Sequence, residues 1–256
     1  MPGIHDICRR IRRHCLIIGL PVLISPAIAT ADLTDIKVYS PLVEKDEREL
    51  EIIGNATFDD DAEAHGSQHH EFELGFGLTE RWATSLTASL IKPAGDSLRY
   101  DIVGWENTIQ LAEEGQYWVD LGVHFEIELE DEEDRANNLE FRFILERTAG
   151  GYQHTVNVNI EQQWGRHAQE DLEIEYIWRS RRIIAPHVQA GFEAFGDLGE
   201  LADIEPLREQ EHRVGPALYY DLELGSIALE GKLAWLFGLT PGSADHTFHW
   251  QLEFLF

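Results

Sequence analysis

The chain has 256 residues and a formal net charge of −27, which disfavours nucleic acids and anionic membrane surfaces as partners. Its two cysteines, Cys8 and Cys15, both lie near the N-terminus, in a segment that we expect to be removed. The remaining chain then has no thiol for disulfides, thiolate metal ligation or nucleophilic catalysis. The length fits a single all-β barrel domain.

The N-terminus has the pattern of a secretory signal peptide. Arg9, Arg10, Arg12 and Arg13 precede an apolar run over residues 16–24, and Ala27-Ile28-Ala29 offers a cleavage site. We therefore expect residues 1–29 to be a signal peptide, residues 30–48 a periplasmic N-terminal segment, and residues 49–256 a transmembrane β-barrel. Two alternatives stay open for residues 31–46, which form either a periplasmic tail or a plug that enters the lumen.

Apolar residues recur at every second position from Leu50 onward, which indicates strands. Val119, Leu121, Val123 and alternate residues up to Leu129 share one face of a strand, with polar residues on the other. Repeating this reading predicts about twelve strands, joined alternately by long and short connections, one of the short ones at 180–182. The pattern is typical of a closed, antiparallel, up-and-down transmembrane barrel. A soluble β-sandwich is the alternative, but its strands are ordinarily shorter. Rim aromatics, Phe195 among them, also favour a membrane barrel.

The last strand carries a resemblance to a known group of proteins. Apolar residues alternate up to a terminal aromatic, at Phe248, Trp250, Leu252, Phe254 and Phe256. This strand resembles the C-terminal strand of Gram-negative outer-membrane β-barrel proteins of the porin-like kind. The resemblance implies an outer-membrane location, contact with lipid and lipopolysaccharide, and recognition of this strand by the barrel assembly machinery.

The polar faces of the strands are rich in carboxylates. If the apolar faces meet lipid, the lumen is lined by Glu71, Glu73, Asp120, His124, Glu126, Glu128, Glu173, Glu175, Asp221 and Glu223. Carboxylates in a pore concentrate cations. The pattern predicts a passive, cation-preferring channel or porin for small cationic or polar solutes. The alternative is a barrel filled by these side chains, which conducts little.

One predicted loop and its flank combine acidic residues with histidines: Asp59, Asp60, Asp61, His65, His69 and His70. Such ligands suit a loop-bound divalent cation, and no other cofactor is expected. The alternatives are a solvated loop, or a non-conducting barrel whose loops bind divalent metal, lipopolysaccharide or a protein partner. The barrel faintly resembles copper resistance protein B, but its only methionine is Met1, which argues against methionine-rich copper binding.

No catalytic site is expected. Twelve-stranded barrels include an outer-membrane phospholipase, which uses a lipid-facing His with a Ser two residues on. In this chain His154 is followed by Thr155 and Val156, so the serine is missing. Carboxylate pairs such as Glu126 and Glu128 follow from strand alternation alone. The sequence therefore predicts a protein that is not an enzyme.

Overall fold

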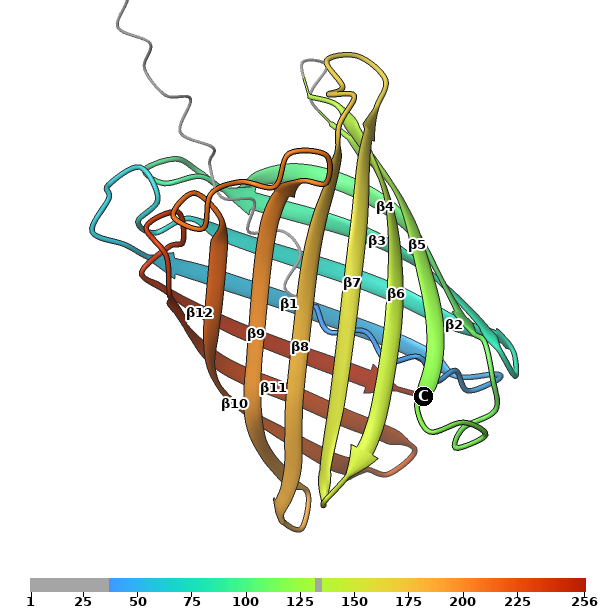
Figure 1. The fold of residues 1–256 in the computed structure, drawn as a ribbon. Coiled ribbons are helices and arrows are strands. Elements are labelled where there is room, and N and C mark those ends of the chain that lie inside the picture. Colours follow the sequence, from blue (N-terminus) through green and yellow to red (C-terminus); the bar gives the residue numbers. More distant parts are fainter. Residues whose placement is uncertain (1–36, 132–134) are drawn as a thin grey trace, which may run out of the picture.

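A computed structural model describes residues 37–131 and 135–256 of the chain, which form one closed barrel of twelve antiparallel strands (Figure 1). The predicted signal peptide, residues 1–29, lies outside the described residues. The strands are β1 (Arg48–Phe58), β2 (Gln68–Thr79), β3 (Trp82–Lys92), β4 (Arg99–Gln110), β5 (Asp120–Glu130), β6 (Asn137–Ala149), β7 (Tyr152–Trp164), β8 (Leu172–Ala185), β9 (Val188–Glu200), β10 (Glu211–Leu224), β11 (Ile227–Gly238) and β12 (His246–Leu255).

Each strand pairs with its neighbours in the chain, and β1 pairs with β12 to close the sheet. The closing register runs from Glu49 opposite Leu255 to Phe58 opposite His246. The Phe256 N–H extends it by donating to the Arg48 carbonyl at 3.0 Å. Closure removes the unpaired strand edges that a hydrocarbon environment does not tolerate. The predicted fold class is confirmed.

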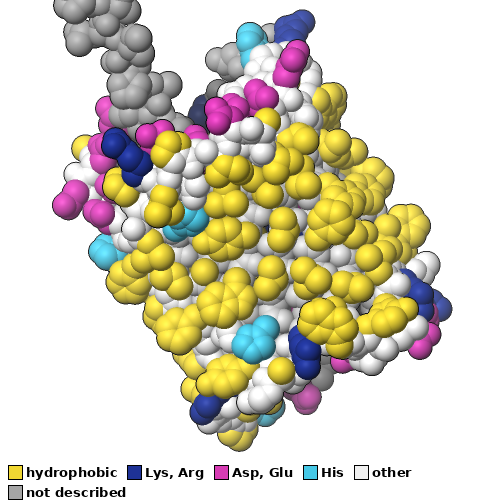
Figure 2. Space-filling view, in the orientation of Figure 1, with side chains coloured by type: hydrophobic (Ala, Val, Ile, Leu, Met, Phe, Trp, Pro, Cys, Tyr) yellow, Lys and Arg dark blue, Asp and Glu magenta, His cyan; other side chains and the backbone are white. Residues whose placement is uncertain are grey.

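The face of the barrel seen in Figure 2 carries a broad apolar belt, and large apolar side chains are exposed on strands all around the barrel. On β2, Phe72, Leu74, Phe76 and Leu78 are all exposed, whereas Glu73 between them is buried. Outward polar groups on this belt are covered by tryptophans: the Trp82 indole donates to the Asn107 side chain at 3.0 Å. No helix among the described residues is long and apolar enough to cross a membrane.

Connections are short at one rim and longer at the other, as predicted, but two short-rim connections differ from expectation. Strand β8 continues through 180–182 to Ala185, and the turn lies at Pro186 and His187. His187 takes a left-handed backbone conformation there, with φ of 62°. The other difference is the connection over residues 111–119, which is longer than predicted and exposes Trp118.

The apolar belt predicts a depth-dependent cost of charge on the lipid-facing surface. Leu74, midway along β2, and Leu224, at the short-turn end of β10, are 49% and 55% exposed. We expect Leu74→Arg to lower the free energy of unfolding by about 2–4 kcal/mol and Leu224→Arg by about 0–1 kcal/mol. Urea unfolding in lipid vesicles measures both. Equal costs at the two positions would contradict the placement of the belt.

Candidate functional site: the partitioned lumen

Glutamates stand opposite one another on consecutive strands of the inner wall. Glu253 of β12 lies between Glu230 of β11 and Glu51 of β1, and Glu51 faces Glu73 of β2. After β3, which contributes Ser85 and Thr87 at this level, the series continues from β4 to β8. It consists there of Glu106, Glu126, Glu140, Glu161 and Glu173 in direct cross-strand register. We call these nine residues the glutamate stripe.

The glutamate stripe runs obliquely along the inner wall from rim to rim. Glu253 and Glu230 lie near the short-turn ends of β12 and β11. Glu161 and Glu173 lie near the loop ends of β7 and β8. Like charges directly opposite one another destabilise a sheet. Shared protons or nearby cations relieve this repulsion.

One of these cations comes from outside the wall. Lys37, the first described residue, lies inside the barrel with its ammonium beside three carboxylates. Its Nζ is 2.8 Å from Glu51 Oε2, forms an ion pair with Glu73 and is 4.0 Å from Glu106 Oε2. The side chain thus bridges β1, β2 and β4.

Tyr39 attaches the same N-terminal segment to β6 and β7. Its backbone N–H donates to Asn157 Oδ1 at 2.9 Å, and Asn157 Nδ2 donates to its carbonyl at 3.1 Å. The Arg142 guanidinium lies 4.2 Å from the centroid of the Tyr39 ring and donates to the Lys37 carbonyl at 3.1 Å. Arg142 also pairs with Glu140 at 2.7 Å.

Val38, between these two residues, faces an apolar cluster on the inner wall of β8 to β11. The cluster contains Ile177, Phe195, Ala217, Tyr219, Ala234 and Leu236. The prediction that Phe195 belongs to a rim aromatic belt is wrong, because it is buried inside the barrel. Lys37 therefore contacts carboxylates, Val38 contacts apolar side chains, and Tyr39 contacts polar and basic groups of β6 and β7.

Glycines of the wall make room for the N-terminal segment. A Cβ on Gly122 would lie 2.8 Å from Pro41 Cα, and one on Gly77 would lie 1.8 Å from the Glu44 carbonyl oxygen. The Asp46 N–H donates to the Gly77 carbonyl at 2.8 Å. Of the two alternatives for this segment, its described residues 37–43 correspond to the plug.

Basic side chains occur mainly on the wall opposite the Lys37 cluster. Arg179 of β8 lies 3.5 Å from Glu146, and Lys232 of β11 lies 3.4 Å from Glu193. Tyr219 donates its hydroxyl hydrogen to Glu193 at 2.8 Å. Each of these two basic side chains thus has a carboxylate partner within the wall.

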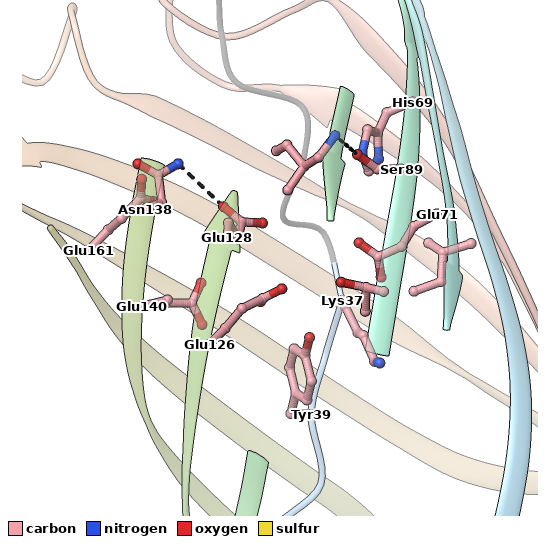
Figure 3. A pocket seen from close by; sticks show the side chains of 13 residues that line it. Lys37, Tyr39, His69, Glu71, Ser89, Glu126, Glu128, Asn138, Glu140 and Glu161 are labelled. Carbon is pink, nitrogen blue, oxygen red and sulfur yellow. Dashed lines mark hydrogen bonds between the residues drawn. The ribbon is translucent and has the colours of Figure 1, made fainter. Parts of the chain in front are cut away.

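Lys37 and Tyr39 divide the lumen into two cavities. The cavity toward the short turns has a volume of about 590 Å³ and is lined by Glu49, Glu230, Glu253 and Arg181, among others. At its mouth, burial and the nearby Glu44 and Glu230 raise the pKa of Glu47. The cavity on the other side has about 30 Å³ and lies among Glu71, Glu126 and Glu140 (Figure 3). Lys37 and Tyr39 line both.

The structure places the predicted lumen residues at three levels. Glu71, Glu126 and Glu128 line the small cavity, Glu73 lines the large one, and His124 is fully buried between β4 and β6. Higher on the loop side, Glu175 accepts from Asn159 at 3.1 Å, and Glu173 continues the stripe.

The remaining three lumen residues lie near the short-turn rim. Asp120 accepts the Gly115 N–H at 2.6 Å. Asp221 contacts His187 at 2.7 Å, and Glu223 is exposed. These three therefore lie away from the partition formed by Lys37 and Tyr39.

The six residues of the predicted metal loop are not brought together. His69 faces the lumen, whereas His70 packs beside Trp250. Asp59 and Asp61 use their carboxylates to accept N–H groups of their own loop, at 2.7 and 2.9 Å. Within residues 37–131 and 135–256, sets of three potential ligands converge at His124-Glu126-Glu140 and Glu71-Glu73-Glu106, neither of which includes a loop residue.

Sequence reasoning missed Lys37, Tyr39, Glu51 and Glu106 as site residues. Glu51 and Glu106 alternate with apolar residues like the glutamates that were selected, so the same signal was available for them. Lys37 and Tyr39 had none, because they precede the first strand.

The close contact at Gly122 predicts that a larger side chain there dislodges the N-terminal segment. We expect Gly122→Val to strain the docked segment by about 1–3 kcal/mol. A Ser40→Cys thiol, in a chain with Cys8 and Cys15 replaced by Ser, should then react with a water-soluble maleimide roughly tenfold faster or more. Thr247→Val, near the loop end of β12, is the control. An unchanged rate in Gly122→Val would show that the segment is not docked there.

Comparison with known proteins identifies the architecture. No protein-family model matches the chain, and no curated protein matches it in sequence. Among solved structures, it is similar to an outer membrane channel from Pseudomonas putida F1, with a TM-score of 0.58 and 11% identity over 86% of this chain and 99% of that one. It is also similar to the NanC porin, with a TM-score of 0.53 and 10% identity over 81% and 98% of the two chains. The chain thus has the barrel fold of outer-membrane channels and porins, as the final strand predicted.

Proposed function

We propose that the protein is a passive, cation-preferring channel for small solutes in the outer membrane of a Gram-negative bacterium. The observation that carries this proposal is the glutamate stripe, which extends from the short-turn rim to the loop rim and is interrupted only at β3 among the described strands. A series of carboxylates offers a permeating cation successive binding positions, which conduction requires. Small cationic or polar solutes are the expected cargo.

The charge balance supports the preference for cations. Arg179 and Lys232 each pair with a carboxylate of their own wall. Five glutamates line the small cavity, and Lys37 is the one Lys or Arg among the described residues around it, so carboxyl groups predominate there and the potential is negative. In a narrow lumen with low-dielectric walls, this potential raises the local concentration of cations and excludes anions.

The partition limits the size of the solute. The cavity on the loop side of Lys37 has about 30 Å³, enough for about one or two water molecules. With the N-terminal segment docked, only ions and very small molecules fit beside Lys37 and Tyr39. We infer a channel whose conductance depends on how firmly this segment is held.

Neutralising the stripe should weaken ion selectivity. We expect wild-type protein in a planar bilayer, under a KCl gradient, to show a reversal potential of the sign given by cation preference. Glu230→Gln combined with Glu173→Gln should move this potential toward zero, because the two substitutions remove charge near the two ends of the stripe. Glu63→Gln in an exposed loop is the control. Anion preference in the wild-type protein would refute the proposed function.

Weakening the attachment of the segment should raise the conductance. Asn157→Ala removes both hydrogen bonds to the Tyr39 backbone. At about 1 kcal/mol for each bond, the released fraction rises roughly tenfold or more. Single-channel recordings should then show larger or more frequent openings than in wild type, with Asn159→Ala as the control.

The same recordings separate the channel from the rival function, a non-conducting barrel whose acidic loops bind divalent metal, lipopolysaccharide or a protein partner. The partition of the lumen is the observation that favours this rival. If neither the wild type nor Asn157→Ala conducts, the rival is correct.

A further inference from the structure

The carboxylate cluster around Lys37 is a cation site with a tethered occupant. Glu51, Glu73 and Glu106 come from three different strands and surround one ammonium group that belongs to none of them. Glu71 adds a further carboxylate, since ligand atoms of Glu71, Glu73 and Glu106 all lie within 4.8 Å of one another. Because Lys37 belongs to the N-terminal segment, the site loses its cation whenever the segment moves.

A histidine aimed into this cluster gives an independent indication of its ligand. His124 is fully buried, and its Nδ1 contacts the Thr108 hydroxyl at 3.0 Å, which holds the ring in place. Within the described part of the chain, its Nε2 has no hydrogen-bond partner. This nitrogen lies 4.0 Å from Glu106 Oε2. A buried imidazole held at one nitrogen and free at the other is the usual state of a metal-ligating histidine.

The spacing fits a metal ion. Divalent metals such as zinc lie about 2.0–2.2 Å from imidazole nitrogens and carboxylate oxygens. An ion between His124 Nε2 and Glu106 Oε2, which are 4.0 Å apart, is therefore within bonding distance of both. The second carboxylate oxygen of Glu106, Oε1, is buried and also lacks a hydrogen-bond partner among the described residues. One ammonium does not balance the three carboxylates around it, whereas a divalent ion compensates one more charge.

We propose that the carboxylates of Glu71, Glu73 and Glu106, together with the His124 imidazole beside Glu106, form a binding site for a divalent transition-metal ion, and that the Lys37 ammonium competes for it. The mixed nitrogen and oxygen ligands favour ions such as Mn²⁺, Co²⁺ and Zn²⁺ over Ca²⁺ or Mg²⁺. This inference deepens the proposed cation preference, on which its role in permeation rests, by naming a class of ion and the place where it binds. Metal binding and docking of Lys37 exclude each other.

The competition has a measurable consequence. Because Lys37 occupies the cluster in most molecules, the apparent affinity for metal is the intrinsic affinity multiplied by the fraction of molecules in which the cluster is vacant. We expect purified full-length Lys37→Met protein in detergent micelles to bind one Mn²⁺ about tenfold more tightly than wild type. Lys37→Arg keeps the positive charge and should bind Mn²⁺ no better than wild type. Isothermal titration with MnCl₂ measures the three affinities.

A spectroscopic measurement identifies the histidine. In Lys37→Met, electron spin-echo modulation of bound Mn²⁺ should show coupling to one imidazole nitrogen. Adding His124→Gln should abolish this coupling and weaken binding about tenfold to a hundredfold. Asp59→Asn with Asp61→Asn, which removes loop carboxylates, should leave both readouts unchanged. Heat-modifiable migration in gels verifies that each variant is folded.

Two results would overturn the inference: Lys37→Met binding Mn²⁺ no more tightly than wild type, or nitrogen coupling that persists in His124→Gln. If Lys37→Met fails to fold, Lys37→Gln takes its place in the same measurements. Failure of the channel proposal is separate from both results, because it is measured as the reversal potential in bilayers. If the barrel binds Mn²⁺ at His124 but does not conduct, the metal-site proposal stands and the channel proposal fails.

Discussion

The backbone hydrogen bonds that join β1 to β12 are the constraint on which the rest of the structure depends. A sheet in hydrocarbon must pair every strand edge, so it closes. Closure gives each strand one face toward lipid and one toward the lumen. Every residue between two lipid-facing apolar side chains is thereby placed inside, and in this chain many of these residues are glutamates. The acidic series in the lumen follows from closure combined with this composition.

Cross-strand register then determines how these carboxylates interact. Glu51 opposite both Glu73 and Glu253, and Glu126 opposite both Glu106 and Glu140, create repulsion between neighbouring strands. The N-terminal segment relieves part of this repulsion, because its Lys37 lies beside Glu51, Glu73 and Glu106. Its docking is therefore electrostatic on one side, while Val38 packs against apolar side chains on the other. Docking of this segment therefore both partitions the lumen and compensates part of its charge.

Much of this architecture was predictable from the sequence, since alternation is a local property. Alternation predicted the twelve strands of the closed barrel. Register was not predictable, because it depends on the offset between strands that only the closed barrel defines. The end of β8 was misplaced because its polar run at 180–182 resembles a turn, although the strand continues to Ala185. Docking of residues 37–43 involves contacts with strands far along the chain, for which alternation carries no signal.

The contrast between the loop and the lumen carboxylates shows where cation chemistry resides in this fold. Asp59 and Asp61 look suited to metal in sequence, but their oxygens accept N–H groups of their own loop. Inside the barrel the backbone N–H groups are already used by neighbouring strands, so a lumen carboxylate has only side chains, water or ions to pair with. At Glu106 the Ser85 hydroxyl donates at 3.2 Å, and Lys37 of the N-terminal segment adds a cation beside both Glu73 and Glu106.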